Sequence, residues 1–107
     1  MARVFVSYSR KNAEFVLQMV AHLRAYHIPV WLDQFDLPPG VRWDVAIDAA
    51  LKSCSVMLAI LSPAAVISSN VQDEIGTAVD AGKTIIPVEI EACEAPFRIR
   101  QLQRISF

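Results

Sequence analysis

The sequence lacks the residues and motifs that define disulfide-rich, membrane-spanning and common nucleotide-binding proteins. It contains only 3 glycines and 2 cysteines, so neither a glycine-rich linker nor a disulfide framework is expected. Neither G-x-G-x-x-G nor G-x-x-x-x-G-K-[ST] occurs, which excludes two common nucleotide-binding motifs. The longest purely apolar run is Val56–Leu61, far short of the roughly 20 residues of a membrane-spanning helix.

An excess of charge of either sign is also missing. Lys and Arg total 10 and Asp and Glu total 11, so the chain lacks the basic surplus with which proteins bind nucleic-acid backbones. Apolar residues make up 54% of the 107 residues, which is typical of a folded globular domain. Cys54 and Cys93 do not have metal-ligand spacing. We therefore expect one cytoplasmic domain over residues 1–107, with no metal, no membrane association and no nucleic-acid partner.

Short apolar runs alternate with helical patterns along the chain. The runs are nearly continuous, which is typical of strands covered on both faces. They are Val4–Val6, Ile28–Leu32, Val56–Leu61 and Ile85–Ile90, with a weaker one at Arg104–Phe107. Apolar residues recur at helical spacing from Phe15, Trp43 and Val71, and Gly82 predicts the end of the third helix. This alternation predicts βαβ units on a parallel sheet.

In such a sheet, ligands bind beyond the carboxyl ends of the strands. Those ends carry Ser7–Arg10, Asp33–Asp36, Ser62–Pro63 and Glu91. Ser7, Ser9 and Arg10 could meet a phosphate, because free N–H groups and a guanidinium suit an anion at a helix start. An equally good interpretation is that Ser9 or Asn12 only caps the helix. A phosphorelay receiver is disfavoured, because its acidic residues are absent from these positions.

The segment Asp33–Gly40 contains two prolines and a glycine, so it predicts a stiff loop that cannot join a strand. Phe35 and Leu37 are apolar residues within this loop. The loop either tucks back onto the domain or forms a lid or a protein-binding edge, and its residues favour neither.

Glu74 is the most informative single residue. Ser69 and Gln72 fit a capping box, which predicts a helix that begins near Asn70. At about 100° per residue, Glu74 lies at the edge of an apolar stripe formed by Val71, Ile75, Ala78 and Val79. Its stem is then buried while its carboxylate faces a cleft. On the residues alone, an ordinary glutamate at the boundary of the buried face is the favoured interpretation.

Several short motifs together resemble a TIR domain of the bacterial, NAD+-cleaving kind, over nearly the whole chain. They are Val4–Ser9, Val30–Asp33, Leu37–Gly40 with Trp43 and Ile47, Leu61–Pro63, Asp73–Ile75, Ala81–Lys83 leading to Ile85–Val88, Pro96–Phe97 and Ile105–Phe107. The resemblance implies a flavodoxin-like, three-layer α/β fold with five parallel strands in the order 2-1-3-4-5 and helices on both faces. It also implies that the final helix of the family is lacking.

The resemblance further implies cleavage of NAD+ to nicotinamide and ADP-ribose or its cyclic isomer, in bacterial immune or stress signalling. It places the family's catalytic glutamate at Glu74, with NAD+ as substrate and no cofactor or metal. Residues implied to border the substrate are Ser9, Arg10, Phe35, Trp43 and Asn70. The loop residues Asp36, Leu37, Pro38, Pro39 and Gly40 are implied to move or to dock another TIR domain, because such domains become active on self-assembly.

One position departs from the family pattern. Asn70 stands where many bacterial members carry a tryptophan four residues before the glutamate, so an aromatic wall for the substrate is missing or comes from elsewhere. Asn70 therefore favours an alternative function, a non-catalytic module that acts through TIR–TIR contacts. A nuclease or nucleotide-product synthase that uses the same cleft is a third possibility.

Overall fold

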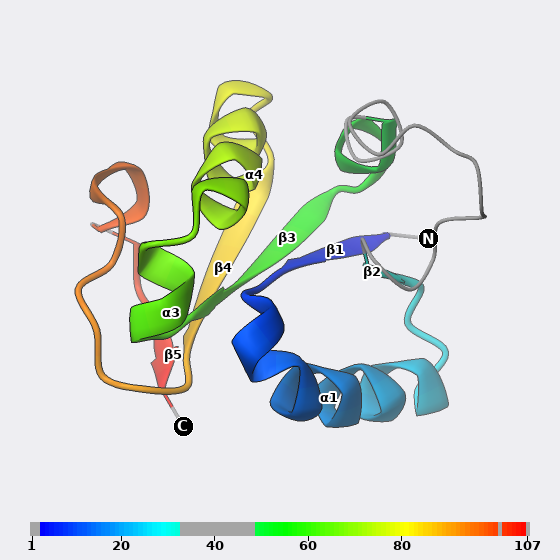
Figure 1. Ribbon diagram of the computed structural model, residues 1–107. Helices are drawn as coiled ribbons and strands as arrows, with labels where there is room; N and C mark the ends of the chain where they lie inside the picture. Colours follow the sequence, from blue (N-terminus) through cyan, green and yellow to red (C-terminus); the bar gives the residue numbers. More distant parts are fainter. Residues whose placement is uncertain (1–2, 33–48, 101, 107) are drawn as a thin grey trace, which may run out of the picture.

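The computed structural model describes residues 3–32, 49–100 and 102–106 (Figure 1). These residues form a parallel five-stranded sheet in the order β2-β1-β3-β4-β5. The strands are β1 (Val4–Ser7), β2 (Val30–Leu32), β3 (Val56–Leu61), β4 (Thr84–Glu89) and β5 (Ile105–Ser106). The predicted fold class and strand order are confirmed.

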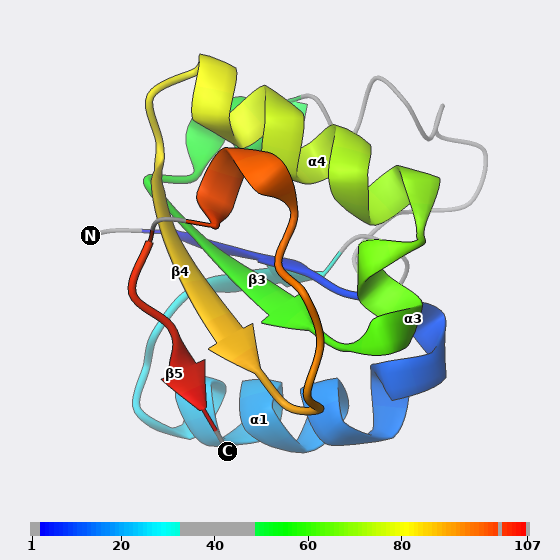
Figure 2. The same ribbon diagram turned by 90° about the vertical axis from the view of Figure 1, so that its left-hand side faces the viewer.

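Helices cover both faces of the sheet. The 3-10 turn η1 (Arg10–Asn12) leads into α1 (Ala13–Ala25), which lies on one face. The opposite face carries α3 (Pro63–Val66), α4 (Ser69–Asp80) and the helical residues 49–53, and a second 3-10 turn, η2 (Phe97–Ile99), lies beside α4 (Figures 1 and 2). Among the described helices, none is long and apolar enough to cross a bilayer.

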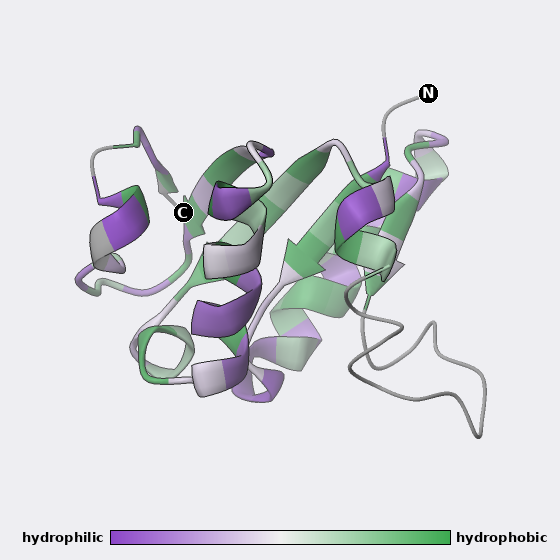
Figure 3. Cartoon of the chain, turned by 90° about the horizontal axis from the view of Figure 1, so that it is seen from above, coloured by the Kyte–Doolittle hydropathy of each residue, from purple (hydrophilic) through white to green (hydrophobic). Residues whose placement is uncertain are grey.

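Alternate strand residues supply two separate apolar cores. Phe5 belongs to the core beneath α4 and stacks on Trp31, with ring centroids 5.0 Å apart. Val6 belongs to the core beneath α1, together with Val16 and Ile60. Figure 3 shows the strands as mostly hydrophobic ribbons and the helix layer above them with recurrent hydrophilic segments. Burial on both faces explains why the strands appear in the sequence as continuous apolar runs.

The end of α1 corrects one predicted boundary. The N–H of Ile28 donates to the carbonyl of Leu23, and the N–H of His27 donates to that of Arg24. These two bonds form a Schellman cap in which His27 adopts a left-handed conformation, with φ of 61°. Because the amide of Ile28 belongs to this cap, β2 begins at Val30 and not at Ile28. Helix α4 ends with the same motif at Gly82, as predicted.

The predicted capping box of α4 is wrong by one residue. Ser68 is the N-cap, with extended backbone angles, and its Oγ accepts a hydrogen bond from the N–H of Val71 at 3.4 Å. Ser69 lies inside the first turn, so its side chain is not placed to cap the helix. The side chain of Gln72 donates to the carbonyl of Val66 and not to the amide of the cap residue. The helix therefore begins at Ser69.

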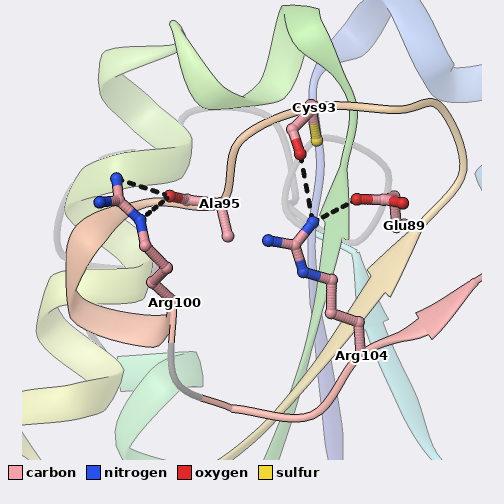
Figure 4. Close-up of polar contacts among 5 residues, drawn as sticks. All are labelled: Glu89, Cys93, Ala95, Arg100 and Arg104. Atoms are coloured by element: carbon pink, nitrogen blue, oxygen red, sulfur yellow. Dashed lines mark hydrogen bonds and ion pairs between the residues drawn. The ribbon is translucent and has the colours of Figure 1, made fainter.

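Strand β5 is joined to β4 by side chains as well as by strand pairing. The guanidinium of Arg104 forms an ion pair with Glu89 and donates to the carbonyl of Cys93 at 3.1 Å (Figure 4). Arg100 donates through two nitrogens to the carbonyl of Ala95, each at 3.3 Å. The Arg104 contacts fasten β4 and the segment after it to the start of β5, and the Arg100 bonds stabilise that segment internally.

Candidate active site

Glu74 projects from α4 onto the carboxyl end of β1. Ser7 Oγ donates a hydrogen bond to Glu74 Oε1 at 2.7 Å. Ser7 is 0% exposed and Glu74 is 5% exposed, and Glu74 Oε2 is buried as well. The predicted burial of the stem is confirmed, but the prediction that the carboxylate faces a cleft is wrong for the described residues, because the carboxylate is buried against Ser7. A carboxylate held in a shielded position at this edge is suited to stabilising a cation in a bound ligand.

Short side chains on the sheet leave space for this long side chain. Ser7 pairs in parallel register with Ala59 of β3, which pairs with Pro87 of β4. Residues in register point to the same face, and Ala59 belongs to the core beneath α4. Val71 and Ile75 of α4 are buried in that same core. Their burial keeps this side of α4 against the sheet and directs Glu74 toward Ser7.

A second hydrogen-bonded group joins three elements at the same edge. Ser62, buried at the end of β3, donates through Oγ to Asn12 Oδ1 at 2.6 Å. The same Oγ accepts from the N–H of Ala65 at 3.1 Å and so caps α3. Asn12 Nδ2 in turn donates to Glu91 Oε1 at 3.4 Å. This group fixes the turn after β1 against the ends of β3 and β4.

The other predicted substrate residues lie in two places. Ser9 and Arg10 belong to the turn after β1, where Ser9 Oγ accepts from the N–H of Lys11 at 3.3 Å and caps η1. Ser9 therefore caps this turn, while its role toward a phosphate or nucleotide stays a prediction, and Asn12 makes no capping bond with its side chain. Asn70 is exposed in the first turn of α4, one turn before Glu74.

Part of the predicted site lies outside the described residues. Phe35 and Trp43 belong to this part, as does the predicted interaction loop of Asp36, Leu37, Pro38, Pro39 and Gly40. Their assignments stay predictions. In the parts of the chain that the structure describes, no three His, Cys, Asp or Glu side chains are grouped as metal ligands.

Two relationships escaped prediction from the sequence, namely the pairing of Ser7 with Glu74 and the link from Ser62 through Asn12 to Glu91. Ser7, Ser62 and Glu91 all lie at or just after the carboxyl ends of strands, where ligands of parallel sheets bind. Ser7 and Glu74 are 67 residues apart, so their spacing carries no signal. The sequence signal that could have indicated these contacts is a serine that directly follows a buried apolar run.

Glu74 does not line two of the surface grooves formed by the described residues. One, of about 650 Å³, separates the outer side of α4 from η2 and is bordered by Gly76, Asp80 and Arg98. Arg98 hydrogen-bonds to Asp80 at 2.5 Å, and this bond, with the charge of Arg98, holds the pKa of Asp80 below its usual range. The other, of about 410 Å³, lies between Phe15 and Glu91.

Comparison with known proteins identifies the family. The sequence matches the family described as TIR domain over residues 4–107. The chain belongs to the TIR domain family. This TIR domain is similar in structure to that of the Toll-related receptor TRR-2 from Hydra magnipapillata, with a TM-score of 0.90 and 18% identity. That match covers 100% of this chain and 85% of the receptor domain.

Two further solved structures share the fold of this TIR domain. One is BcmB, a CMP N-glycosidase from Clostridium botulinum, with a TM-score of 0.72 and 23% identity over 98% of this chain and 88% of BcmB. The other comprises the TIR domains of the activated Roq1 resistosome, with a TM-score of 0.65 and 15% identity over 88% of this chain and 60% of that chain. No curated protein matches the sequence.

Proposed function

We propose that this TIR domain cleaves the bond between nicotinamide and ribose in NAD+, with Glu74 as the catalytic carboxylate. The observation that carries the proposal is the buried carboxylate of Glu74, held by Ser7 at the carboxyl end of β1. Ligands of open parallel sheets bind at this edge. The shared fold of BcmB, named as a CMP N-glycosidase, supports the same class of bond cleavage.

The chemistry needs one anionic side chain and no acid. The bond between C1′ and the nicotinamide nitrogen breaks, and its electron pair goes to nicotinamide, which leaves as a neutral molecule. The ribose then acquires oxocarbenium-like character, as in glycoside cleavage generally. The carboxylate of Glu74 stabilises that cation. Water adds to C1′ and releases one proton, which yields ADP-ribose, while attack by the adenine ring would give the cyclic isomer.

The remaining roles follow from the resemblance to other TIR domains. Ser9 and Arg10 border the nucleotide from the turn after β1, and Asn70 does so from α4. Phe35 and Trp43 flank the substrate, and the loop Asp36–Gly40 contacts a second copy of the domain. We propose that self-assembly in the cytoplasm switches on the activity as part of an immune or stress response.

Release of nicotinamide from NAD+ tests this proposal. The wild-type domain should release nicotinamide at high protein concentration or when clustered on beads. Glu74→Ala should release none under the same conditions. Its circular dichroism spectrum should match that of wild type, which would show that the fold is intact. Asp73→Ala is the matched control, because Asp73 is an exposed acidic residue on the same helix turn. It should behave as wild type. Equal release by Glu74→Ala would remove Glu74 from the reaction.

A second candidate function is favoured by Asn70, whose exposed amide lies where an aromatic side chain would border the substrate. In this case the domain acts only through TIR–TIR contacts. Substitution of Leu37 or Pro39 should then weaken self-association, whereas Glu74→Ala should not, and clustered wild-type protein should release no nicotinamide. Product analysis by mass spectrometry separates hydrolysis from nuclease or synthase activity.

A further inference from the structure

We propose that Ser7 is a positioning residue for Glu74, an inference that rests on the function proposed above. The hydroxyl of Ser7 fixes one oxygen of the Glu74 carboxylate and thereby sets the direction in which the carboxylate meets the ribose. Ser7 acts through Glu74 and needs no contact of its own with the substrate.

The contact between the two side chains is short and shielded from water. The distance from Ser7 Oγ to Glu74 Oε1 is 2.7 Å, and both residues are buried. An ionised carboxylate can only accept hydrogen bonds, so the serine hydroxyl is the donor. A hydrogen bond to a charged group in a shielded site is stronger than one between neutral groups. This bond therefore holds the carboxylate in one orientation and stabilises its charge.

Ser7 is a rigid anchor because its backbone belongs to an inner strand. β1 is paired with β2 on one side and with β3 on the other, and Ser7 itself lies in register with Ala59. A glutamate side chain has several rotatable bonds, so an unrestrained Glu74 carboxylate would sample several positions. The hydrogen bond to a fixed hydroxyl restricts that freedom before substrate arrives, which is the requirement for an organised catalytic group.

A second buried serine offers a matched comparison. Ser62 is also 0% exposed and follows the neighbouring strand β3 at the same edge. Its hydroxyl is engaged with Asn12 and with the amide of Ala65, and so it serves the scaffold. Substitution of either serine by alanine removes one buried hydroxyl. The two substitutions differ in whether that hydroxyl bonds to Glu74.

The test is steady-state kinetics of nicotinamide release by clustered wild type, Ser7→Ala, Ser7→Thr and Ser62→Ala, with folding checked by circular dichroism. Ser7→Ala should lower kcat roughly 10- to 100-fold, the factor that a hydrogen bond to a charged group commonly contributes. Its KM should change less than about threefold, because ground-state binding does not depend on this bond. Ser7→Thr retains the hydroxyl and should recover most of kcat.

Ser62→Ala should keep kcat near the wild-type value, because Ser62 does not contact Glu74; its melting temperature should fall, and its KM should rise, since Ser62 holds the turn that carries Ser9 and Arg10. A kcat of Ser7→Ala within about threefold of wild type would overturn this inference alone. So would an equal loss of kcat in Ser62→Ala, since the effect would then be a general one of a lost buried hydroxyl. Absence of nicotinamide release by wild type would instead overturn the proposed function, and this inference with it.

Discussion

Ser62 Oγ and Asn12 Oδ1 lie 2.6 Å apart and join residues that are 50 positions distant in the chain. Asn12 directly precedes α1, and Ser62 directly follows β3. The bond therefore ties the start of the helix on one face to a central strand. Asn12 does not use its side chain to cap α1, because that side chain is already engaged with Ser62 and Glu91.

Ser62→Ala should destabilise the domain by about 1–3 kcal/mol, because it removes the bond to Asn12 and the cap of α3 together. Urea denaturation followed by circular dichroism measures this loss. Ser53→Ala is the control, because Ser53 is exposed and its hydroxyl donates to the carbonyl of Ala50 within the same short helical segment. Its effect should stay within about 0.5 kcal/mol. A loss of no more than about 0.5 kcal/mol in Ser62→Ala would show that the Ser62 contacts are not stabilising.

Glu74→Gln should abolish nicotinamide release without loss of stability. Glutamine keeps an oxygen that accepts from Ser7, and it removes the cost of burying a charge. The free energy of unfolding at pH 7 should be unchanged or about 1 kcal/mol higher, as is common when a buried functional charge is removed. A loss of about 2 kcal/mol or more in urea denaturation would indicate that the carboxylate is retained for structure.

His27→Gly should raise the free energy of unfolding by about 1 kcal/mol. His27 has a φ of 61° at the end of α1, a conformation in which side chains with a Cβ are strained and glycine is not. Gly82 occupies the equivalent position at the end of α4, with a φ of 70°. Gly82→Ala should therefore lose a similar amount, and the two variants should shift the melting temperature in opposite directions. Shifts of the same sign would contradict this account.

Cys93 should react slowly with iodoacetamide at neutral pH. Burial raises the pKa of its thiol, the nearby charges of Glu89 and Glu91 add to this, and Arg104 opposes it. The thiolate is the reactive form, so below the pKa of Cys93 the folded protein should be alkylated more slowly than the unfolded protein, and its rate should level off at a higher pH. Measurement in a Cys54→Ala variant isolates Cys93, and the urea-unfolded protein gives the reference rate. A folded rate at pH 7 equal to the unfolded rate would contradict the prediction.

The architecture could be predicted because its determinants are local. Strand β3 appears as the unbroken apolar run Val56–Leu61, and Gly82 marks the end of α4 at the residue with positive φ. The errors also have local causes. Ile28 is apolar and looks like strand, but its amide completes the cap of α1. Ser68 and Ser69 are adjacent serines, and only the backbone conformation determines which one caps α4.

The candidate site could be predicted in part. Helical spacing predicted the burial of the Glu74 stem beside Val71 and Ile75, whereas the catalytic role proposed for Glu74 comes from the resemblance to TIR domains. Its partner could not be found in this way, because helix α4 and strand β1 meet only in the folded chain. The ion pair of Arg104 with Glu89 escaped prediction for the same reason. Local sequence patterns indicate which face of a helix or strand is buried. They do not indicate which residue of another element contacts that face.

The separation of Ser7 from Glu74 along the chain has a consequence for folding. A contact across 67 residues forms only after the long intervening loop closes, and such non-local contacts slow folding. During synthesis, β1 emerges well before α4 exists to meet it. The carboxylate and its serine therefore come together late, when β1, β3 and α4 are all in place. A partly folded chain contains both residues and still lacks the arrangement that the proposed reaction requires.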